Sequence, residues 1–186
     1  MAYRKTEKVL AQLEAKRQTI LDVATDIIAK RGLDALSTDL VCERAKIGLG
    51  SLYRDFADKH EIWAAIIARA LARDVGAIDE ADSRETYPIN AFARALGMLY
   101  DNADQPRLAR ALAASDAYRE AVGEALAGLI GQACPMPPST RKRAAAASLA
   151  ILAMAERDSR GAKGDTIAFI LRGIGVPARA AEAMAR

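Results

Sequence analysis

The chain has 186 residues, of which 52 % are apolar and 27 % are charged, so it is long and apolar enough to bury a core. This composition excludes a disordered chain, and no uncharged apolar stretch is long enough to span a membrane. The net charge of +3 weakly indicates an anionic partner. The chain starts without an apolar signal core, and Cys42 and Cys134 lack metal-ligand spacing. We therefore expect a soluble cytoplasmic protein that holds no metal and no cofactor.

Abundant alanine and the lack of an alternating strand pattern predict an all-α fold. A first helix is expected over residues 20–28, where apolar residues recur at helical spacing. Gly32 follows two basic residues and is expected to end this helix. The more polar segment before it is either a helical extension or a basic arm, with the basic residues Arg4, Lys5 and Lys8.

Two short helices joined by a tight turn are expected next. Ser37 or Thr38 can cap the first one, which cannot continue past Gly48. The second begins after Gly48 and ends at about Phe56, and Asp58 caps the longer helix that follows. Two short helices with such a turn are typical of a helix-turn-helix motif.

The rest of the chain is predicted to be a helical bundle. Pro88 and Pro106 suit first helical turns, and the CPMPP stretch that begins at Cys134 is expected to break the chain. Two late segments, 144–155 and 167–174, are apolar on most sides and need burial on most sides. They are either core helices or, in the interpretation we adopt, helices that also meet a second copy of the chain. The predicted dimer contacts are Ala145, Leu149, Leu152, Ile167, Ile170 and Leu171.

Residues 17–67 carry a spaced set that points to a family, namely Arg17, Ile20, Leu21, Ala24, Gly32, Ser37, Val41, Ala45, Ile47, Gly50, Ser51, Leu52, Tyr53, Phe56, Lys59 and Ile62. This set resembles the DNA-binding domain of the TetR (tetracycline-repressor-like) family of bacterial transcriptional regulators. The resemblance implies a three-helix N-terminal domain, residues 1–60, with its helix-turn-helix at about 37–56. It also implies a C-terminal helical bundle, residues 61–186, for ligand binding and dimerisation.

The chain departs from the family pattern at four positions. Lys46 stands where the family usually has glycine, and it must adopt a conformation that suits glycine better unless Gly48 shifts the turn. Gly48 itself replaces serine, and Cys42 replaces alanine. Leu49 stands where a basic residue is common, so it cannot make the phosphate or base contact of that residue and can touch a thymine methyl instead.

The expected DNA contacts follow from the tip of the second short helix. Small residues there let the backbone approach a major groove, and the helix N-terminus offers free N–H groups to phosphate. We interpret Tyr53 as a phosphate donor, with plain core as the alternative, and Lys59 as a phosphate contact, with a solvated lysine as the alternative. Phe56 and Trp63 are interpreted as scaffold. The complete set of DNA-binding candidates is Ser37, Thr38, Lys46, Gly48, Leu49, Gly50, Ser51, Tyr53, Arg54 and Lys59.

The resemblance implies a repressor that binds an inverted-repeat operator in double-stranded DNA as a homodimer and is released by a small-molecule effector. Candidate effector contacts, each with ordinary core as the alternative, are Phe92, Met98, Tyr100, Tyr118 and Met154. An enzyme is not expected, because the only histidine, His60, belongs to no catalytic or metal motif. A helical adaptor without sequence-specific DNA binding remains the alternative function, although it leaves the Gly50–Tyr53 motif unexplained.

Overall fold

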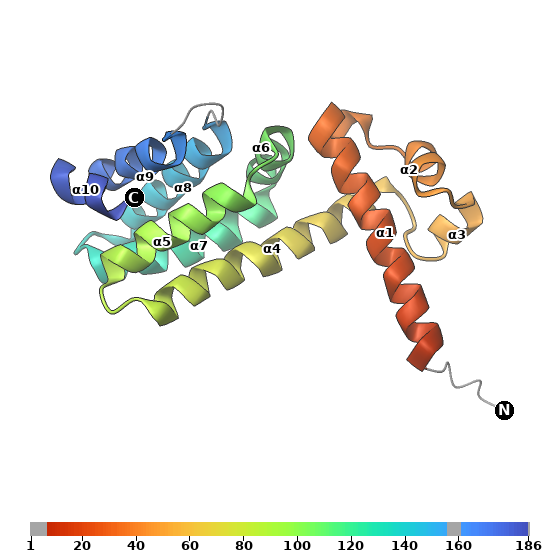
Figure 1. The fold of residues 1–186 in the computed structure, drawn as a ribbon, viewed down its shortest axis with the longest axis horizontal. Coiled ribbons are helices and arrows are strands. Elements are labelled where there is room, and N and C mark those ends of the chain that lie inside the picture. The colour runs from red at the N-terminus through yellow and green to blue at the C-terminus, as the bar shows by residue number, and fades with distance from the viewer. Residues whose placement is uncertain (1–6, 156–160, 186) are drawn as a thin grey trace. The chain divides into compact units, whose positions relative to one another are not determined.

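The structure, a computed structural model, describes residues 7–155 and 161–185, and every regular element within them is helical (Figure 1), which confirms the all-α prediction. The predicted basic arm residues Arg4 and Lys5 lie outside the described residues. The chain forms two compact units, residues 1–66 and 67–186. The helices are α1 (Glu7–Arg31), α2 (Thr38–Ala45), α3 (Leu49–Tyr53), α4 (Lys59–Arg84), α5 (Pro88–Asn102), α6 (Pro106–Ala114), α7 (Asp116–Ala133), α8 (Pro138–Met154), α9 (Ala162–Gly173) and α10 (Ala178–Met184), with a short 3-10 turn, η1 (Leu33–Ala35).

The first unit is built on α1, which packs against η1 and α2, while α2 packs against α3. The polar start of α1 is helical from Glu7 on, so the helical-extension interpretation holds for the described part. Gly32 ends the helix as predicted, with φ at +90° and its amide donating to the Ile28 carbonyl at 2.8 Å. The buried apolar core of this unit comprises Ile20, Leu21, Ala24, Ile27, Ile28, Leu36, Val41, Cys42, Leu52, Phe56, Ile62 and Ile66.

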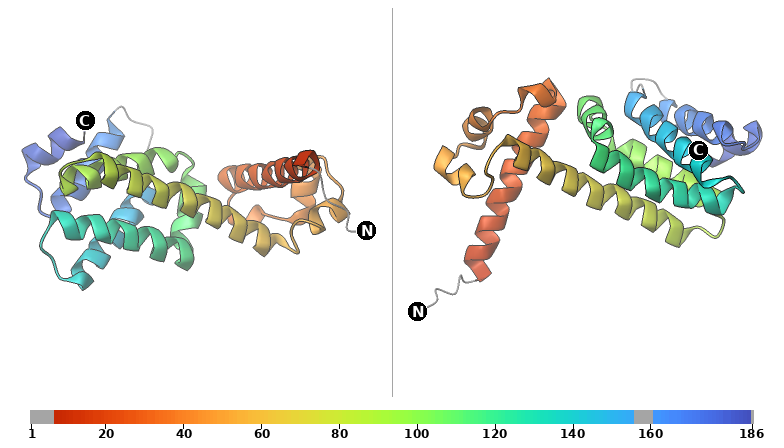
Figure 2. Two further views of the ribbon diagram at one scale, coloured as in Figure 1. Left: turned by 90° about the horizontal axis from the view of Figure 1, so that it is seen from below. Right: turned by 180° about the vertical axis from the view of Figure 1, so that it is seen from behind.

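The second unit is a bundle in which α7 packs against α5, α6 and α8, and α9 packs against α5, α8 and α10. Figure 2 shows these helices from two further sides. Pro88 and Pro106 occupy first helical positions, as predicted. The prediction for α9 was wrong at its start, because the helix begins at Ala162 after Gly161 in the left-handed conformation. Asp165 lies in the first turn of this helix.

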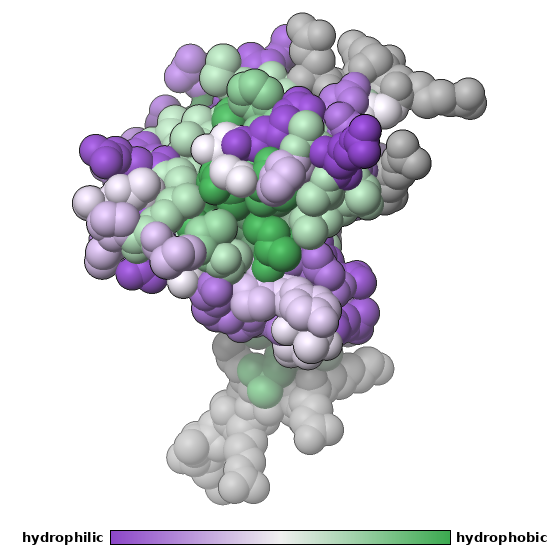
Figure 3. All heavy atoms as spheres, turned by 90° about the vertical axis from the view of Figure 1, so that its left-hand side faces the viewer, coloured by the Kyte–Doolittle hydropathy of each residue, from purple (hydrophilic) through white to green (hydrophobic). Residues whose placement is uncertain are grey.

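The surface is not uniformly polar, and on one side of the molecule apolar side chains gather between polar ones (Figure 3). Within the described ranges, no helix combines the length and apolar character that crossing a membrane requires. Both cysteines are free thiols; Cys42 is buried in the first unit, whereas Cys134 is partly accessible in the second.

Candidate functional site

Helix α2 starts with a side-chain cap that the sequence predicted. Ser37 has extended backbone, and its Oγ accepts a hydrogen bond from the Leu40 amide at 3.3 Å. Such a cap satisfies one of the amides that the first turn of a helix leaves unpaired. The helix buries Val41 and Cys42 against α1 and thereby fixes the direction in which the following turn leaves.

The turn after α2 passes through Lys46 in the left-handed conformation, with φ 55° and ψ 45°. Its amide donates to the carbonyls of Cys42 and Glu43, which ends α2 as a glycine at this position would. Lys46 is the one non-glycine residue with positive φ among those the structure describes. The strained conformation expected at Lys46 is confirmed, and Gly48 keeps ordinary extended backbone as the N-cap of α3.

Helix α3 has a buried side and an open side. Leu52 is buried, and so is Phe56 just beyond the helix end, which anchors α3 to the core. Leu49 and Tyr53 are exposed, with 52 % of Tyr53 accessible. The helix ends at Tyr53, three residues earlier than predicted, because Arg54 and Asp55 form a turn that returns the chain to α4.

Gly48 and Gly50 border open space on the side where a side chain would project. A side chain added at either residue would meet no atom of the chain within 4 Å, and neither residue has positive φ. The fold therefore does not require glycine at these positions. Inside α3, Gly50 even disfavours the helix by about 0.5–1 kcal/mol relative to alanine. The open space leaves room for the close approach of a partner.

Two basic side chains of α1, Lys16 and Arg17, hold α3 and the turn after it in place. This role was not predicted from the sequence. The Arg17 guanidinium lies 4.2 Å from the centre of the Phe56 ring and donates to the Asp55 carbonyl at 2.9 Å. The Lys16 ammonium donates to Ser51 Oγ. Nothing local in the sequence signals these contacts, since they join residues more than thirty positions apart.

The start of α4 is capped as predicted. Asp58 Oδ1 accepts from the amides of His60 and Glu61 at 2.8 and 2.9 Å. Lys59, the first residue of α4, is exposed although a cation there is unfavourable for the helix dipole. Trp63, which we interpreted as scaffold, lines a groove with Leu33 and Leu36 on the first unit.

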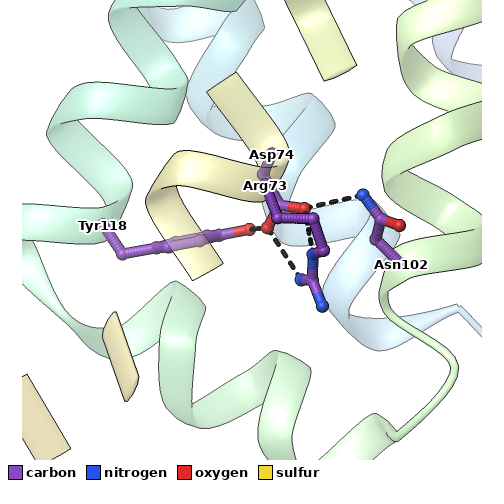
Figure 4. Close-up of polar contacts among 4 residues, drawn as sticks. All are labelled: Arg73, Asp74, Asn102 and Tyr118. Carbon is purple, nitrogen blue, oxygen red and sulfur yellow. Dashed lines mark hydrogen bonds and ion pairs between the residues drawn. The ribbon is translucent and has the colours of Figure 1, made fainter. Parts of the chain in front are cut away.

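The second unit buries a charged cluster that we did not predict (Figure 4). Asp74 on α4 is only 1 % exposed, and its carboxylate accepts four hydrogen bonds. Oδ1 accepts from Arg73 Nε and Asn102 Nδ2, both at 2.8 Å. Oδ2 accepts from Arg73 Nη2 at 3.0 Å and from the Tyr118 hydroxyl at 2.5 Å. The spacing held a signal, because Asp74 stands at helical distance from the buried residues Ala70 and Ala77.

The Asp74 cluster fixes the protonation of its partners. Burial, followed by the negative charge and hydrogen bond of Asp74, raises the pKa of Tyr118 well above its ordinary value. The hydrogen bond to Asp74 raises the pKa of Arg73. Tyr118 therefore keeps its proton and remains a donor near neutral pH, while Arg73 remains charged.

This cluster forms one wall of a narrow cavity of about 20 Å³ between the helices of the second unit. Arg73, Asn102 and Tyr118 line it together with Gln105, and the other lining residues are alanine and leucine side chains from α5, α6 and α8 and the turns beside them. The Gln105 side-chain oxygen is buried without a hydrogen-bond partner. The cavity thus combines apolar walls with one small polar end.

Comparison with known proteins identifies the first unit. Residues 20–66 match the sequence model of the family described as bacterial regulatory proteins, tetR family. The chain carries a TetR-family domain. None of the curated protein sequences compared with the chain matches it.

Solved structures resemble the chain over nearly its whole length. RolR in complex with its ligand resorcinol is 20 % identical, with a TM-score of 0.63, and the match covers 95 % of each chain. A gamma-butyrolactone receptor, an ArpA-like protein, is 19 % identical, with a TM-score of 0.68 and coverage of 94 % of this chain and 96 % of that one. The ketosteroid transcriptional regulator KstR2 of Mycobacterium tuberculosis is 17 % identical, with a TM-score of 0.62 and coverage of 85 % and 94 %. The chain therefore has the TetR-like fold, with an N-terminal helix-turn-helix and a C-terminal helical domain.

The structure places the DNA-binding candidates of the TetR-family domain mainly at its surface. Ser37, Thr38 and Ser51 are half-buried, and Ser37 and Ser51 already hold hydrogen bonds within the chain. The exposed candidates are Lys46, Gly48, Leu49, Gly50, Tyr53, Arg54 and Lys59. The Tyr53 hydroxyl makes no hydrogen bond within the part of the chain that the structure describes, so it is available to a partner.

The predicted effector residues do not gather in one cavity of the TetR-like fold. Tyr118 lines the narrow cavity described above, whereas Met98 lines a separate, wider cleft beside α9. Phe92 and Tyr100 are buried in the core, and Met154 is 76 % exposed at the end of α8. Periodicity identified apolar residues of these helices but could not tell which side of each helix meets which neighbour.

The six residues predicted for dimer contacts lie on the inward sides of α8 and α9. Each is buried within the single chain, so none offers surface to a second copy. The outward side of the same helices carries Met154 and Phe169, which is 58 % exposed. They line an open, mainly apolar groove between α8 and α9, together with Ala150, Ile151, Ala155, Asp165 and Thr166. We call this surface the α8/α9 face.

Proposed function

We propose that the chain is a transcriptional regulator that acts in the cytoplasm as a repressor. In this proposal it is not an enzyme; it binds an inverted-repeat operator as a homodimer and is released by a small-molecule effector. DNA binding belongs to about residues 1–60, and effector binding and dimerisation belong to residues 61–186. The observation that carries the proposal is the open side of α3, where two glycines that the fold does not require stand beside the free Tyr53 hydroxyl.

The open side of α3 suits a DNA groove physically. A helix enters the major groove by its N-terminal end, where Gly48 and Gly50 allow the backbone to come close to the base edges. Tyr53 can donate to a phosphate, and Lys46 and Lys59 add positive charge on exposed positions. Because α3 has little more than one turn, a single copy reads few base pairs, and a two-fold dimer doubles the recognised sequence.

The α8/α9 face supports the homodimer. Two exposed large apolar side chains and small alanines around them are an unfavourable surface for a free monomer to leave in water. A symmetric dimer buries the same patch from both copies, which is the commonest arrangement of soluble oligomers. The fold relatives named above, one bound to resorcinol and one a gamma-butyrolactone receptor, support a small-molecule effector for this chain.

The decisive experiment is selection of bound duplexes from a random pool, followed by gel-shift titration of the selected sequence. The proposal expects an inverted repeat and an affinity that falls with salt at a log–log slope of about −0.9 per phosphate contact. No preference over random duplex at any salt concentration would reject the regulator and favour the helical adaptor.

Gly50→Ala is expected to change stability and DNA binding in opposite directions. Alanine suits helix α3 better, so the free energy of unfolding rises by about 0.5–1 kcal/mol. The added methyl group projects into the space that DNA must occupy, so affinity for the operator falls at least about tenfold. Gly76→Ala is the matched control, since Gly76 is also helical and open; it should stabilise the protein and leave operator binding unchanged. Equal operator affinity of the Gly50 variant would contradict close approach at α3.

Tyr53→Phe is expected to weaken binding about fivefold to tenfold per half-site on every sequence, because it removes one hydrogen bond to phosphate. The salt slope should stay the same, since the substitution removes no charge. Lys59→Gln provides the contrast, because removing its positive charge should make the slope shallower by about 0.9 for each phosphate that Lys59 neutralises. An effect of Tyr53→Phe that is confined to one operator base would point to base readout instead.

Phe169→Asp is expected to shift the homodimer toward monomer in sedimentation experiments. A two-fold interface contains the substitution twice, and each aspartate would be buried without a partner. The dimer dissociation constant should therefore rise at least about 100-fold. Gln132→Asp, on the exposed side of α7, is the control that should leave association unchanged. A dimer that survives Phe169→Asp intact is not formed by the α8/α9 face.

A further inference from the structure

The polar groups that line the narrow cavity differ in whether they already have a hydrogen-bond partner. Three of its lining side chains donate to Asp74: Arg73 with two nitrogens, Asn102 with its amide and Tyr118 with its hydroxyl. Each carboxylate oxygen thereby accepts two hydrogen bonds, which fills the usual capacity of a carboxylate. A molecule entering the cavity thus finds the Asp74 carboxylate saturated and the donor atoms that reach it engaged.

Among the polar atoms of the residues that line the cavity, the one that is both buried and without a hydrogen-bond partner is an acceptor. Gln105 Oε1 lies buried at the cavity wall and receives no hydrogen bond. Gln105 also precedes α6, but there its backbone carbonyl accepts from the Ala109 amide at 2.9 Å, and its side chain makes no capping bond. No hydrogen bond within the described chain therefore explains the burial of Gln105 Oε1, and a buried acceptor without a donor disfavours the empty state.

The charges of the cavity wall cancel. Arg73 is the one charged residue among the described residues that line the cavity, and its guanidinium forms an ion pair with the Asp74 carboxylate at 2.8 Å. A charged molecule would give up its hydration and find no free counter-charge in exchange. The remaining walls, such as Leu99, Leu108 and Leu149, offer contact only to apolar groups.

We infer that this cavity takes a small uncharged molecule that is mainly apolar and donates one hydrogen bond to Gln105 Oε1. The inference rests on the effector role proposed above and specifies its chemistry. The present space of about 20 Å³ holds little more than one water molecule. Ligand entry therefore widens the cavity by rotation of the leucine side chains that form its walls.

The test uses four matched compounds: para-ethylphenol, para-ethylanisole, para-ethylbenzoate and para-ethylbenzylammonium. Binding to the full chain without DNA is measured by saturation-transfer magnetic resonance and calorimetry. We expect the phenol to bind about fivefold to tenfold tighter than its methyl ether, which lacks the donor. The two ions should bind more weakly than either. Failure of the phenol to bind up to its solubility limit, or an ion that binds tightest, would overturn the inference.

Two glutamine variants test whether the preference for the phenol over its methyl ether comes from Gln105. Gln105→Leu removes the acceptor at similar size, so the phenol should lose its advantage over the ether. Gln132→Leu changes the same residue type on the exposed side of α7 and should keep the advantage. A preference for the phenol that survives Gln105→Leu would place the donor contact elsewhere and reject this assignment.

Asp74→Asn tests whether the ion pair between Arg73 and Asp74 disfavours charged ligands, and this test does not depend on Gln105. Asparagine keeps the shape but removes the carboxylate that pairs directly with Arg73, so para-ethylbenzoate should bind at least about tenfold tighter than to the unaltered chain. Helical circular dichroism checks that the variant is folded. Unchanged binding of the benzoate by the folded variant would show that the ion pair does not set the charge of the ligand.

A separate measurement distinguishes the inference from the proposed function. Release of the selected operator is followed by gel shift with the same four compounds. Binding of the phenol without release would support the ligand chemistry and reject the effector role of the cavity. Release by an ion alone would support the effector role and reject the ligand chemistry.

Discussion

Phe56→Ala is expected to lower the free energy of unfolding of the first unit by about 3–5 kcal/mol. The ring is 1 % exposed and lies under the Arg17 guanidinium, so its removal leaves a cavity and deprives Arg17 of its stacking contact. A loss of this size is a large part of the stability of a small domain, and operator binding should fall with it.

Trp63 makes this prediction measurable, because it is the only tryptophan and lies in the first unit. Denaturant unfolding followed by its fluorescence reports that unit. Phe56→Leu should be much less destabilising, since it keeps most of the buried volume. Tyr53→Ala, at an exposed position of α3, should change stability by less than about 1 kcal/mol. A Phe56→Ala variant as stable as Tyr53→Ala would show that the ring does not hold α3 in place.

Asp74→Ala is expected to cost the second unit about 2–4 kcal/mol, because it leaves the buried Tyr118 hydroxyl and the Asn102 amide without their acceptor. The Arg73 side chain is partly exposed, so water can replace some of the hydrogen bonds that its guanidinium loses. The midpoint of denaturation by helical circular dichroism measures the loss.

Asp101→Ala is the matched control for Asp74. Asp101 also pairs with a cation, Lys163, but at an exposed site, where such a pair contributes at most about 1 kcal/mol. Double substitution of Asp74→Ala with Tyr118→Phe should recover part of the stability, because the unsatisfied hydroxyl is then absent. Equal losses from Asp74→Ala and Asp101→Ala would mean that the buried cluster does not support the fold.

Local hydrogen bonding explains the features that could be predicted from the sequence. The caps at Ser37 and Asp58 and the stop at Gly32 depend on residues within four positions, and the sequence contains those partners. The left-handed turn at Lys46 was expected from the family resemblance, because that family usually has glycine at this position.

Contacts between distant helices explain what could not be predicted. Met154 and Ala145 both belong to an apolar stretch, yet one is exposed and the other buried, and only the neighbours of α8 decide this. The end of α3 was placed too late for a similar reason, since Phe56 is buried by the core rather than by the helix. Asp74 was overlooked because its partners Asn102 and Tyr118 come from α5 and α7.

Each unit contains one free cysteine, so the modification of each unit by a thiol reagent can be followed separately. Cys42 is shielded by the core of the first unit, so a thiol reagent can modify it only after that unit has opened. Cys134 is partly accessible in the second unit and should react directly with the folded chain. The delay between the two modifications therefore measures how often the first unit opens, and a bound operator should lengthen it.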